Sequence, residues 1–395
     1  MRSSRNRSFT SRSASIWLAV ALGLSTSLAA HAVQDCELDG TAVNPANGDT
    51  TRGKTGLMRC RDRDSGQLER EQELRNGSFM GVVRHYSNGR VAREYSVDAK
   101  GNMNGRSREF YPGGQLRRDA VYEDGHVIGL ARSFHLNGQL RRGAFHADPG
   151  GERAAVEFTE SGQLASLRCG DRPLLAPVFD DARLCGFDGA PSQVELFDAR
   201  GGLRARITFV DGKRVRGERF YDNGRSESQD ETVDGLRTER RFSSEGVRRY
   251  ELVSLAGERT FKQRELEYSE RGTLVREQRW SPTGQALADE TNYLNGQPRS
   301  RTIYSGEGAA RIAEVTEFQD NGQRATQGRF SSPAPRGRLL PIGAHRRFDE
   351  RGRMVAESVY DDKGRLVRER AWNDDGTPVR DDEVFEDGSR KVFAR

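Results

Sequence analysis

The chain has 395 residues, of which 34% are hydrophobic and 31% are charged, and its formal net charge is +5 at pH 7. This apolar content is low for a globule of that length with one deep core. It favours either disorder or an elongated array whose repeats contact only their neighbours. The aromatic residues, 18 Phe, 10 Tyr and 3 Trp, are spread along the chain and argue against disorder.

Residues 1–32 have the layout of a secretory signal peptide. Four arginines precede an apolar run at 16–24, and the tripeptide AHA at 30–32 is a small-x-small cleavage site. We therefore expect cleavage near Ala32–Val33 and a mature chain that is periplasmic or secreted. The apolar run is about half of the roughly 20 residues that a membrane-spanning helix needs.

Removal of this signal changes the charge balance. The signal holds four arginines and no acidic residue, which leaves 60 basic against 59 acidic residues in the mature chain. A nearly neutral chain does not indicate a nucleic-acid partner, and it disfavours binding to anionic lipid. Contact with a membrane surface stays open, but a membrane span is not expected. Arginine and glutamate alternate along the sequence, as in cross-strand charge pairing.

Four cysteines remain after processing, at Cys36, Cys60, Cys169 and Cys185. Export makes disulfides plausible, and four cysteines allow three connectivities. We favour Cys36 with Cys60 and Cys169 with Cys185, because the members of each pair are close in sequence and lie where the repeat described next is interrupted. No C-x-x-C occurs, which argues against a thioredoxin-like centre and a cysteine zinc site.

An internal repeat organises most of the sequence. Residues 108–118 of the segment REFYPGGQLRRDAVYEDG match RSFHLNGQLRR at 132–142 in seven of eleven positions. Thirteen such units follow one another, mostly 22–26 residues apart. Each unit has a glycine at its turn: Gly66, Gly89, Gly114, Gly138, Gly162, Gly202, Gly224, Gly246, Gly272, Gly296, Gly322, Gly352 and Gly376.

The repeat predicts an all-β protein. Segments after the turns alternate with period two, as in Leu203, Ala205 and Ile207, and Asn-Gly pairs such as Asn223-Gly224 suit the positive φ of tight hairpin turns. Helical periodicity of any length is missing. We expect an elongated, twisted antiparallel meander of about 13 tandem β-hairpins, which would extend roughly 125 Å as one continuous sheet.

Interruptions of the repeat define five segments. After the signal peptide, a disulfide-containing cap at 33–63 leads into repeat block 1 at 64–168. A disulfide-stapled insertion at 169–191 separates this block from repeat block 2 at 192–395. A proline-rich loop at 331–344 should leave the sheet, because proline cannot donate to a strand ladder. Whether the two blocks share one sheet stays open.

No residue is predicted to have a catalytic, cofactor-binding or metal-binding role. Carboxylates such as Asp222 and Asp320 lie at repeated turn positions, and the histidines form no H-x-x-x-H or similar pair. His135 takes the place that Tyr111 has in the preceding unit, which indicates a ring packed on the sheet. An enzyme would need its catalytic group outside the repeat, where the acidic residues gather only at Asp171, Asp180 and Asp181.

Units such as REFYPGGQLRRDAVYEDG and RSFHLNGQLRRG resemble the MORN-variant repeat of YwqK-type antitoxin proteins, over about residues 64–388. The resemblance implies a row of β-hairpins and an interaction role without catalysis, in which the protein binds a cognate toxin. With an export signal, that toxin would act in the envelope. The last units also resemble the tyrosine-aspartate repeats of large secreted shells.

Two functions are compatible with these features. The first is an exported, non-enzymatic protein that binds a protein partner, of which an antitoxin or immunity protein is one version. The second is an envelope scaffold that binds lipid headgroups or glycans, with the aromatic rows as stacking platforms. Neither function requires a cofactor, and the sequence does not predict an oligomeric state.

Overall fold

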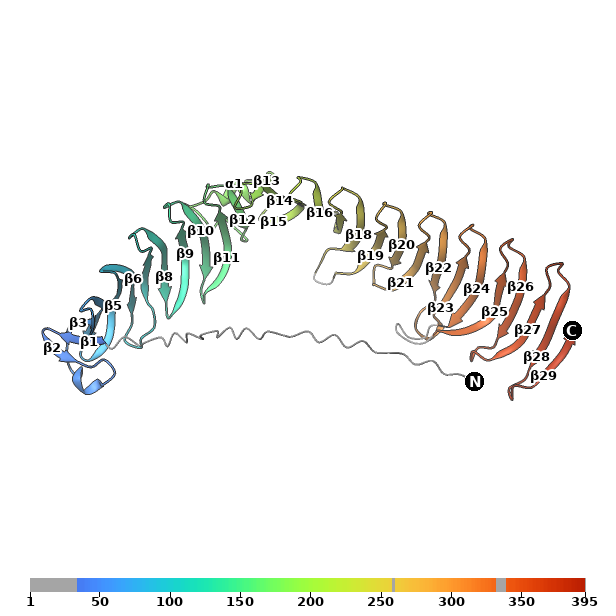
Figure 1. The fold of residues 1–395 in the computed structure, drawn as a ribbon, viewed down its shortest axis with the longest axis horizontal. Coiled ribbons are helices and arrows are strands. Elements are labelled where there is room, and N and C mark those ends of the chain that lie inside the picture. The colour runs from blue at the N-terminus through green and yellow to red at the C-terminus, as the bar shows by residue number, and fades with distance from the viewer. Residues whose placement is uncertain (1–33, 258–259, 332–338, 395) are drawn as a thin grey trace, which may run out of the picture.

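The computed structural model describes residues 34–257, 260–331 and 339–394 (Figure 1). Within these ranges the chain forms 29 strands, which make one 12-stranded and one 17-stranded antiparallel meander that follow each other along an arc. The predicted all-β hairpin array is confirmed. The predicted signal peptide at 1–32 and its cleavage site lie outside the described residues.

The first sheet contains the cap and the first five hairpins, in the order β12 to β3 and then β1 and β2. Its strands are β1 (Gln34–Leu38), β2 (Thr41–Val43), β3 (Gly56–Asp62), β4 (Leu68–Arg75), β5 (Ser78–Ser87), β6 (Arg90–Val97), β7 (Gly105–Phe110), β8 (Leu116–Glu123), β9 (His126–Phe134), β10 (Leu140–Ala147), β11 (Gly151–Phe158) and β12 (Leu164–Arg168). A 3₁₀ turn, η1 (Gly48–Thr50), lies between β2 and β3.

The second sheet runs in chain order from β13 to β29. Its strands are β13 (Ser192–Phe197), β14 (Leu203–Val210), β15 (Lys213–Phe220), β16 (Ser226–Val233), β17 (Leu236–Phe242), β18 (Arg248–Leu255), β19 (Lys262–Tyr268), β20 (Leu274–Trp280), β21 (Ala286–Asn292), β22 (Pro298–Ser305), β23 (Ile312–Phe318), β24 (Arg324–Ser331), β25 (Leu340–Phe348), β26 (Met354–Tyr360), β27 (Leu366–Trp372), β28 (Pro378–Val384) and β29 (Arg390–Ala394). A 3₁₀ turn, η2 (Gly308–Ala310), precedes β23.

The thirteen predicted hairpins correspond to β3–β28, five in the first sheet and eight in the second. They do not form one continuous sheet, because β12 and β13 are not hydrogen-bonded to each other. The insertion between these strands contains a four-residue helix, α1 (Asp181–Leu184). This helix is too short to produce the periodic pattern by which a helix is recognised in sequence.

The insertion packs against both sheets at the crest of the arc (Figure 1). We call this region the joint. Leu175 and Cys185 are completely buried there. They belong to one apolar cluster with side chains from the last strands of the first sheet and the first strands of the second: Ala154, Val156, Leu167, Val194, Ile207 and Phe209. The joint is therefore a small globular core within an otherwise extended array.

Backbone contacts also fasten the insertion. The N–H groups of Asp211 and Gly212, in the turn between β14 and β15, donate to the carbonyl oxygens of Gly186 (3.1 Å) and Cys185 (2.9 Å). On the first sheet, a Cβ on Gly143 would lie 2.9 Å from Cγ2 of Val178 in the insertion. Only a residue without a side chain leaves room for this contact.

Both disulfides favoured from the sequence are present. Cys36 and Cys60 are bonded and lie opposite each other on β1 and β3, so this bond closes the cap. Cys169 and Cys185 are bonded across the insertion, 16 residues apart. The four cysteines thus support the cap and the joint, the two parts of the described chain that have clustered apolar cores.

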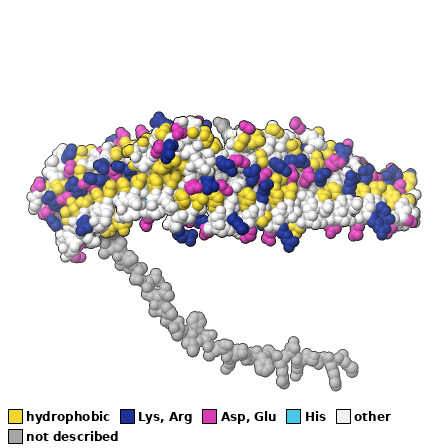
Figure 2. Space-filling view, turned by 90° about the horizontal axis from the view of Figure 1, so that it is seen from above, with side chains coloured by type: hydrophobic (Ala, Val, Ile, Leu, Met, Phe, Trp, Pro, Cys, Tyr) yellow, Lys and Arg dark blue, Asp and Glu magenta, His cyan; other side chains and the backbone are white. Residues whose placement is uncertain are grey.

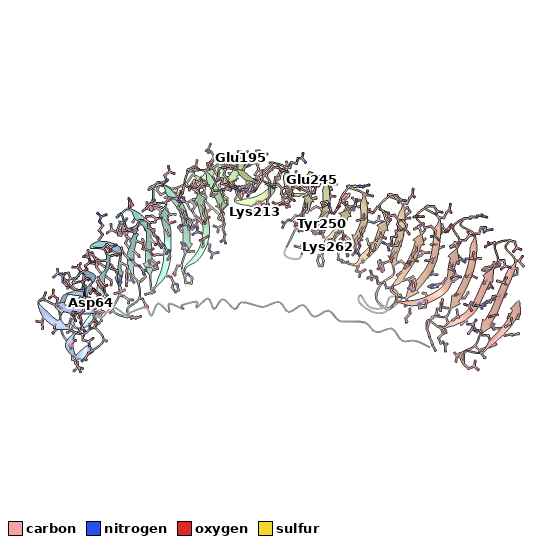
Figure 3. The ribbon with its side chains drawn as sticks, viewed as in Figure 1. Asp64, Glu195, Lys213, Glu245, Tyr250 and Lys262 are labelled. Atoms are coloured by element: carbon pink, nitrogen blue, oxygen red, sulfur yellow. A yellow bond between two sulfur atoms is a disulfide. The ribbon has the colours of Figure 1, made fainter. Side chains whose placement is uncertain are left out.

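Hairpin turns line the two edges of the arc. In the second sheet the turn that contains Glu245 lies on the convex side, whereas Lys213 and Lys262 lie beside turns on the concave side (Figure 3). We call these the outer edge and the inner edge. The glycine-marked turns form the outer edge, and this edge continues across the joint, where Gln163 packs beside Gly201.

One predicted turn glycine was wrong by one position. Twelve of the thirteen glycines have positive φ, but in the turn at 198–202 the positive φ (84°) belongs to Gly201 and not to Gly202. The N–H of Gly201 donates to the carbonyl of Asp198, as Gly224 does to Tyr221 in the next unit. Two consecutive glycines concealed which of them occupies the left-handed position.

The predicted proline-rich loop at 331–344 was too long. Residues 332–338 lie outside the described residues, but Pro341 belongs to β25 and pairs with Phe330 on β24. On its other side, pairing with β26 starts only at Gly343. A proline fits there because one side of the strand has no partner at that position, so no ladder hydrogen bond is lost.

We expect Leu175→Ala to loosen the joint and to affect both sheets. Removal of a fully buried leucine side chain typically costs about 2–5 kcal/mol. Hydrogen exchange should speed up in β12 and β13 together. Leu294→Ala is the control, because Leu294 is 75% exposed on the outer edge and its truncation should change stability by less than about 0.5 kcal/mol. Unchanged exchange in β12 and β13 would show that the insertion does not couple the sheets.

Candidate functional site

A row of alternating charges crosses the first sheet. Its members lie directly opposite one another on successive strands from β3 to β9 and are Arg59, Glu71, Arg84, Glu94, Arg108, Asp119 and Arg132. We call this the first ion row. Each carboxylate contacts two guanidinium groups. Glu94 accepts from Arg84 (2.7 Å) and Arg108 (2.6 Å).

The carboxylates of this row are much less exposed than the arginines. The Asp119 side chain is 7% exposed and accepts from Arg106 (2.7 Å) and Arg132 (2.7 Å). Burial by itself would raise the pKa of Asp119, but the hydrogen bonds from these two arginines outweigh it and hold the pKa below its ordinary value. Glu71 and Glu94 have lowered pKa values from the same balance of burial and hydrogen bonding.

The second sheet has corresponding rows. Opposed residues on β13–β18 are Glu195, Arg206, Glu218, Gln229, Arg240 and Glu251, and those on β25–β28 are Arg346, Glu357, Arg370 and Asp381. Glu357 accepts from Arg346 and Arg370, both at 3.1 Å. Basic and acidic side chains are accordingly interspersed on the surface seen from the outer edge (Figure 2). The arrangement explains the interleaved Arg and Glu of the sequence.

Side chains of the outer-edge turns connect each repeat to the next. The hydroxyl groups of Tyr111, Tyr221 and Tyr293 donate to backbone carbonyls 21–25 residues later. His135 occupies the equivalent position, with Nε2 2.9 Å from the carbonyl of Phe158, as its alignment with Tyr111 predicted. The ring is therefore part of the repeat architecture.

Asparagines of these turns have a role that the sequence did not reveal. The amide groups of Asn137, Asn223, Asn295 and Asn321 each donate to a carbonyl of the following turn, at 2.8–3.1 Å. Their own φ angles are not positive; among the described Asn-Gly pairs, only Asn76 and Asn88 have a positive φ. Asparagine is thus selected at most of these sites for its side-chain amide, which reaches the neighbouring repeat.

Two of the acidic residues considered for catalysis hold the backbone of the insertion. Asp180 caps α1 by accepting from the N–H of Arg183, and the buried Asp181 accepts from the N–H groups of Leu174 and Leu175. In the part of the chain that the structure describes, no three His, Cys, Asp or Glu side chains gather closely enough to hold a metal ion. Nor is any described helix long and apolar enough to cross a bilayer.

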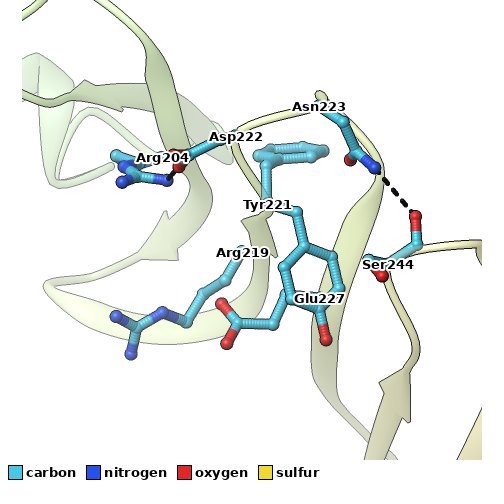
Figure 4. A pocket seen from close by; sticks show the side chains of 8 residues that line it. Arg204, Arg219, Tyr221, Asp222, Asn223, Glu227 and Ser244 are labelled. Carbon is cyan, nitrogen blue, oxygen red and sulfur yellow. Dashed lines mark hydrogen bonds and ion pairs between the residues drawn. The ribbon is translucent and has the colours of Figure 1, made fainter.

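A cavity lies on the outer edge, just after the joint (Figure 4). Its volume is about 670 Å³, and it is lined by Arg204, Arg219, Phe220, Tyr221, Asp222, Asn223, Glu227 and Ser244. We call it the outer-edge pocket. A neighbouring cavity of about 300 Å³ shares Arg204, Tyr221 and Asp222 with it. Of the acidic residues named from the sequence, only Asp222 lines this pocket, where it pairs with Arg204.

One position beside the pocket differs from the corresponding position of several other repeats. In five other hairpins the aromatic residue before the outer turn lies opposite a leucine: Leu116, Leu140, Leu164, Leu203 and Leu274. Phe220 instead lies opposite Ser226, whose Oγ is buried without a hydrogen-bond partner. An alignment of the repeats with one another would have revealed this serine, but a search for catalytic motifs could not.

The meander of hairpins and the rows of paired charges define a β-hairpin repeat protein. One of its repeat units matches a known family of repeats. The profile described as "MORN repeat variant" matches residues 103–124, which include β7 and β8. The chain therefore contains a MORN repeat variant in the hairpin from which the repeat was first recognised. The structure extends hairpins of this kind over both sheets. No curated protein matches the sequence.

Several solved structures have a distant similarity to this chain. They include TcdB2-TccC3-TEV (10% identity, TM-score 0.18, covering 87% of this chain and 20% of that one). The Photorhabdus luminescens Tc holotoxin pore has 11% identity and a TM-score of 0.12, and the match covers 86% of this chain and 24% of the chain in that structure. A eukaryotic initiation factor has 9% identity and a TM-score of 0.19, and covers 87% of both chains. The matched region spans about a fifth to a quarter of the length of the chains in the first two structures.

The lowered carboxylate pKa values predict acid sensitivity. A group whose pKa is lower in the folded state contributes its full stabilisation above the unfolded pKa, about 4 for Asp and Glu, and loses it as pH falls through the folded value. We expect the denaturation midpoint to fall at acid pH.

Asp119→Asn should lower stability at pH 7 by about 1–3 kcal/mol, because Arg106 and Arg132 lose a charged acceptor. It should also reduce the difference between pH 7 and pH 3, as measured by urea denaturation. Asp374→Asn is the control, since Asp374 is 95% exposed. An equal pH effect in the wild type and in the Asp119 variant would contradict a stabilising role for the row.

Proposed function

We propose that the chain is an exported, non-enzymatic repeat protein that binds a protein partner at its inner edge. The observation that carries this proposal is the unequal length of the inner-edge loops on a regular scaffold. The turns at Asp211-Gly212 and Asp234-Gly235 are tight, with positive φ at both residues. By contrast, the connections at 98–104 and 306–311 are several residues longer.

Such variation suits recognition, because loops can change without disturbing the scaffold that holds them. The outer edge is constrained by the hydrogen bonds between consecutive turns, whereas the inner edge has several tight turns and several longer loops. Side-chain charges within the sheets are largely paired in rows. Contacts with a partner would then come from the loops and from exposed apolar residues near them.

Exposed apolar residues occur at one tight inner turn. Val233 and Leu236 lie opposite each other on β16 and β17 beside Asp234-Gly235, and they are 57% and 41% exposed. Leu236 also lies opposite Leu255 on β18. Interfaces are generally anchored by a few apolar or aromatic side chains surrounded by polar ones. We propose Val233 and Leu236 as such an anchor.

Two disulfides indicate an oxidising compartment, in agreement with the predicted signal peptide. A partner in the envelope is therefore part of the proposal. An antitoxin or immunity protein that holds an envelope-acting toxin is its most specific version, and it rests on the resemblance of the repeat units to YwqK-type proteins. No catalytic role is proposed, and Asp180 and Asp181 hold the backbone of the insertion.

A second candidate function is an envelope scaffold that binds glycans or lipid headgroups. The outer-edge pocket favours it, because two aromatic side chains and several polar groups line one open cavity. Charges of both signs in the pocket argue against a strongly anionic headgroup. Of these two ligand classes, a glycan fits better.

The double change Val233→Asp and Leu236→Asp should abolish partner binding without unfolding the chain, because both side chains are exposed. The bait is the mature protein in a crosslinking experiment with an envelope fraction. We expect a specific partner to be lost by about tenfold or more, which equals about 1.4 kcal/mol or more. Leu294→Asp on the outer edge is the matched control and should keep the partner.

Co-production with a toxic product of a neighbouring gene gives a second readout. The wild type and the Leu294 variant should protect the cells, and the double variant should not. If no partner crosslinks and no protection is seen, or if all three proteins behave alike, binding at the inner edge is wrong.

A further inference from the structure

We propose that the outer-edge pocket binds an uncharged saccharide. This inference goes beyond the protein-partner role and does not depend on it, because the pocket and the inner-edge anchor lie at opposite ends of the strands. Its basis is the chemistry of the pocket walls: two aromatic side chains, a balanced set of charges and no strand edge that could pair with a peptide.

The pocket lies beside a serine that stands where five other hairpins have a leucine. Phe220 lines the cavity, whereas its opposite residue Ser226 is not part of the lining and has a buried Oγ. Opposite residues of an antiparallel pair share one face of the sheet, so a leucine in place of Ser226 would pack against the Phe220 ring. A larger residue at 226 should therefore change the position of the ring that lines the pocket.

The charges in the pocket favour a neutral ligand. Arg204 pairs with Asp198 (3.2 Å) and with Asp222, and Arg200 lies 4.0 Å and 3.6 Å from the same two carboxylates, so two arginines and two aspartates balance each other. Arg219 and Glu227 also line the pocket, and one carries a positive and the other a negative charge. A polyanion would be repelled by Glu227, and a polycation by Arg219. Carboxylates and guanidinium groups together can bind neighbouring hydroxyl groups as acceptors and donors.

Aromatic side chains complete the chemistry of a saccharide site. The C–H face of a sugar ring is apolar and stacks on an aromatic ring, while its hydroxyl groups at the rim need hydrogen-bonding partners. Phe220 and Tyr221 provide the rings. Tyr221 is fixed by its hydrogen bond to the Phe242 carbonyl (2.8 Å), and Asn223 by its bond to Ser244 (2.8 Å). The Tyr221 ring and the Asn223 amide are therefore positioned before a ligand binds.

The surroundings disfavour a peptide. Strands β15, β16 and β17 are each paired on both sides, so no backbone edge is free to accept an added strand. The lining is mostly polar, which does not suit the apolar face of an amphipathic helix. The adjoining cavity of about 300 Å³ lengthens the site past Arg204 and Asp222, as an oligosaccharide would require.

Binding of neutral oligosaccharides tests the proposal. The mature protein is titrated calorimetrically with chitohexaose, cellohexaose and maltohexaose, and with a heparin hexasaccharide as the charged probe. At least one neutral oligosaccharide should bind, and the heparin fragment should bind more weakly. Ser226→Leu should fill the space beside Phe220 and weaken binding about tenfold or more, without lowering the melting temperature.

Two further variants separate the chemistry from the packing. Glu227→Gln should weaken binding while leaving the cavity open. Arg324→Leu is the matched control, because Arg324 lies opposite an aromatic residue, Phe318, at the same position of a distant repeat. It should bind the neutral oligosaccharide as the wild type does.

Three results would overturn the saccharide site: no neutral oligosaccharide binds, Ser226→Leu binds as well as the wild type, or heparin binds most tightly. Loss of the protein partner in Ser226→Leu without any saccharide binding would assign the pocket to a protein interface instead. The inner-edge variants address the other proposal, so failure of one leaves the other measurable.

Discussion

The contact between one carboxylate and two guanidinium groups on neighbouring strands is the interaction on which this array depends. Among the residues described after Phe209, the buried hydrophobic side chains of the second sheet are Leu266, Ala288 and Ala313. Apolar burial therefore contributes little there, and backbone ladders hold the strands together with the rows of charge. Isolated surface ion pairs contribute little, but a network in which each carboxylate is largely covered is worth more. Loss of one partner would leave a covered charge uncompensated.

The joint follows a different rule from the repeats on either side. The first ion row ends at Arg132, and the next opposed residues are Gly143, Val156 and Leu167. Gly143 is 24 residues after Asp119 and replaces its carboxylate, which makes room for Val178 of the insertion. At the joint an apolar core replaces the paired charges. The two sheets have no backbone hydrogen bonds between β12 and β13 there, so this core is what connects them. A quasi-one-dimensional array thereby gains one globular element.

The sequence predicted the repeats and the places where they are interrupted. Thirteen hairpins, two disulfides and the insertion between two repeat blocks follow from periodic glycines and from cysteine spacing, since each signal is local. Whether the two blocks share one sheet could not be predicted, because the packing of Leu175 and Cys185 involves strands that are distant in sequence. Pro341 was excluded from the sheet because a sequence does not show that one side of β25 is unpaired there. Ser226 carried a signal, but only in comparison with the leucines of other units.

In a repeat array, specific sites arise from departures from the pattern. Val233 and Leu236 are exposed beside a tight turn on the inner edge, and Ser226 lies opposite Phe220, which lines the pocket on the outer edge. Strand β16, which carries both departures, has eight residues and spans roughly 26 Å at about 3.3 Å per residue. A ligand at one edge would not exclude a ligand at the other. The proposed protein partner on the concave side and the proposed saccharide on the convex side are therefore compatible on one molecule, since the two sites lie at opposite ends of the same strands.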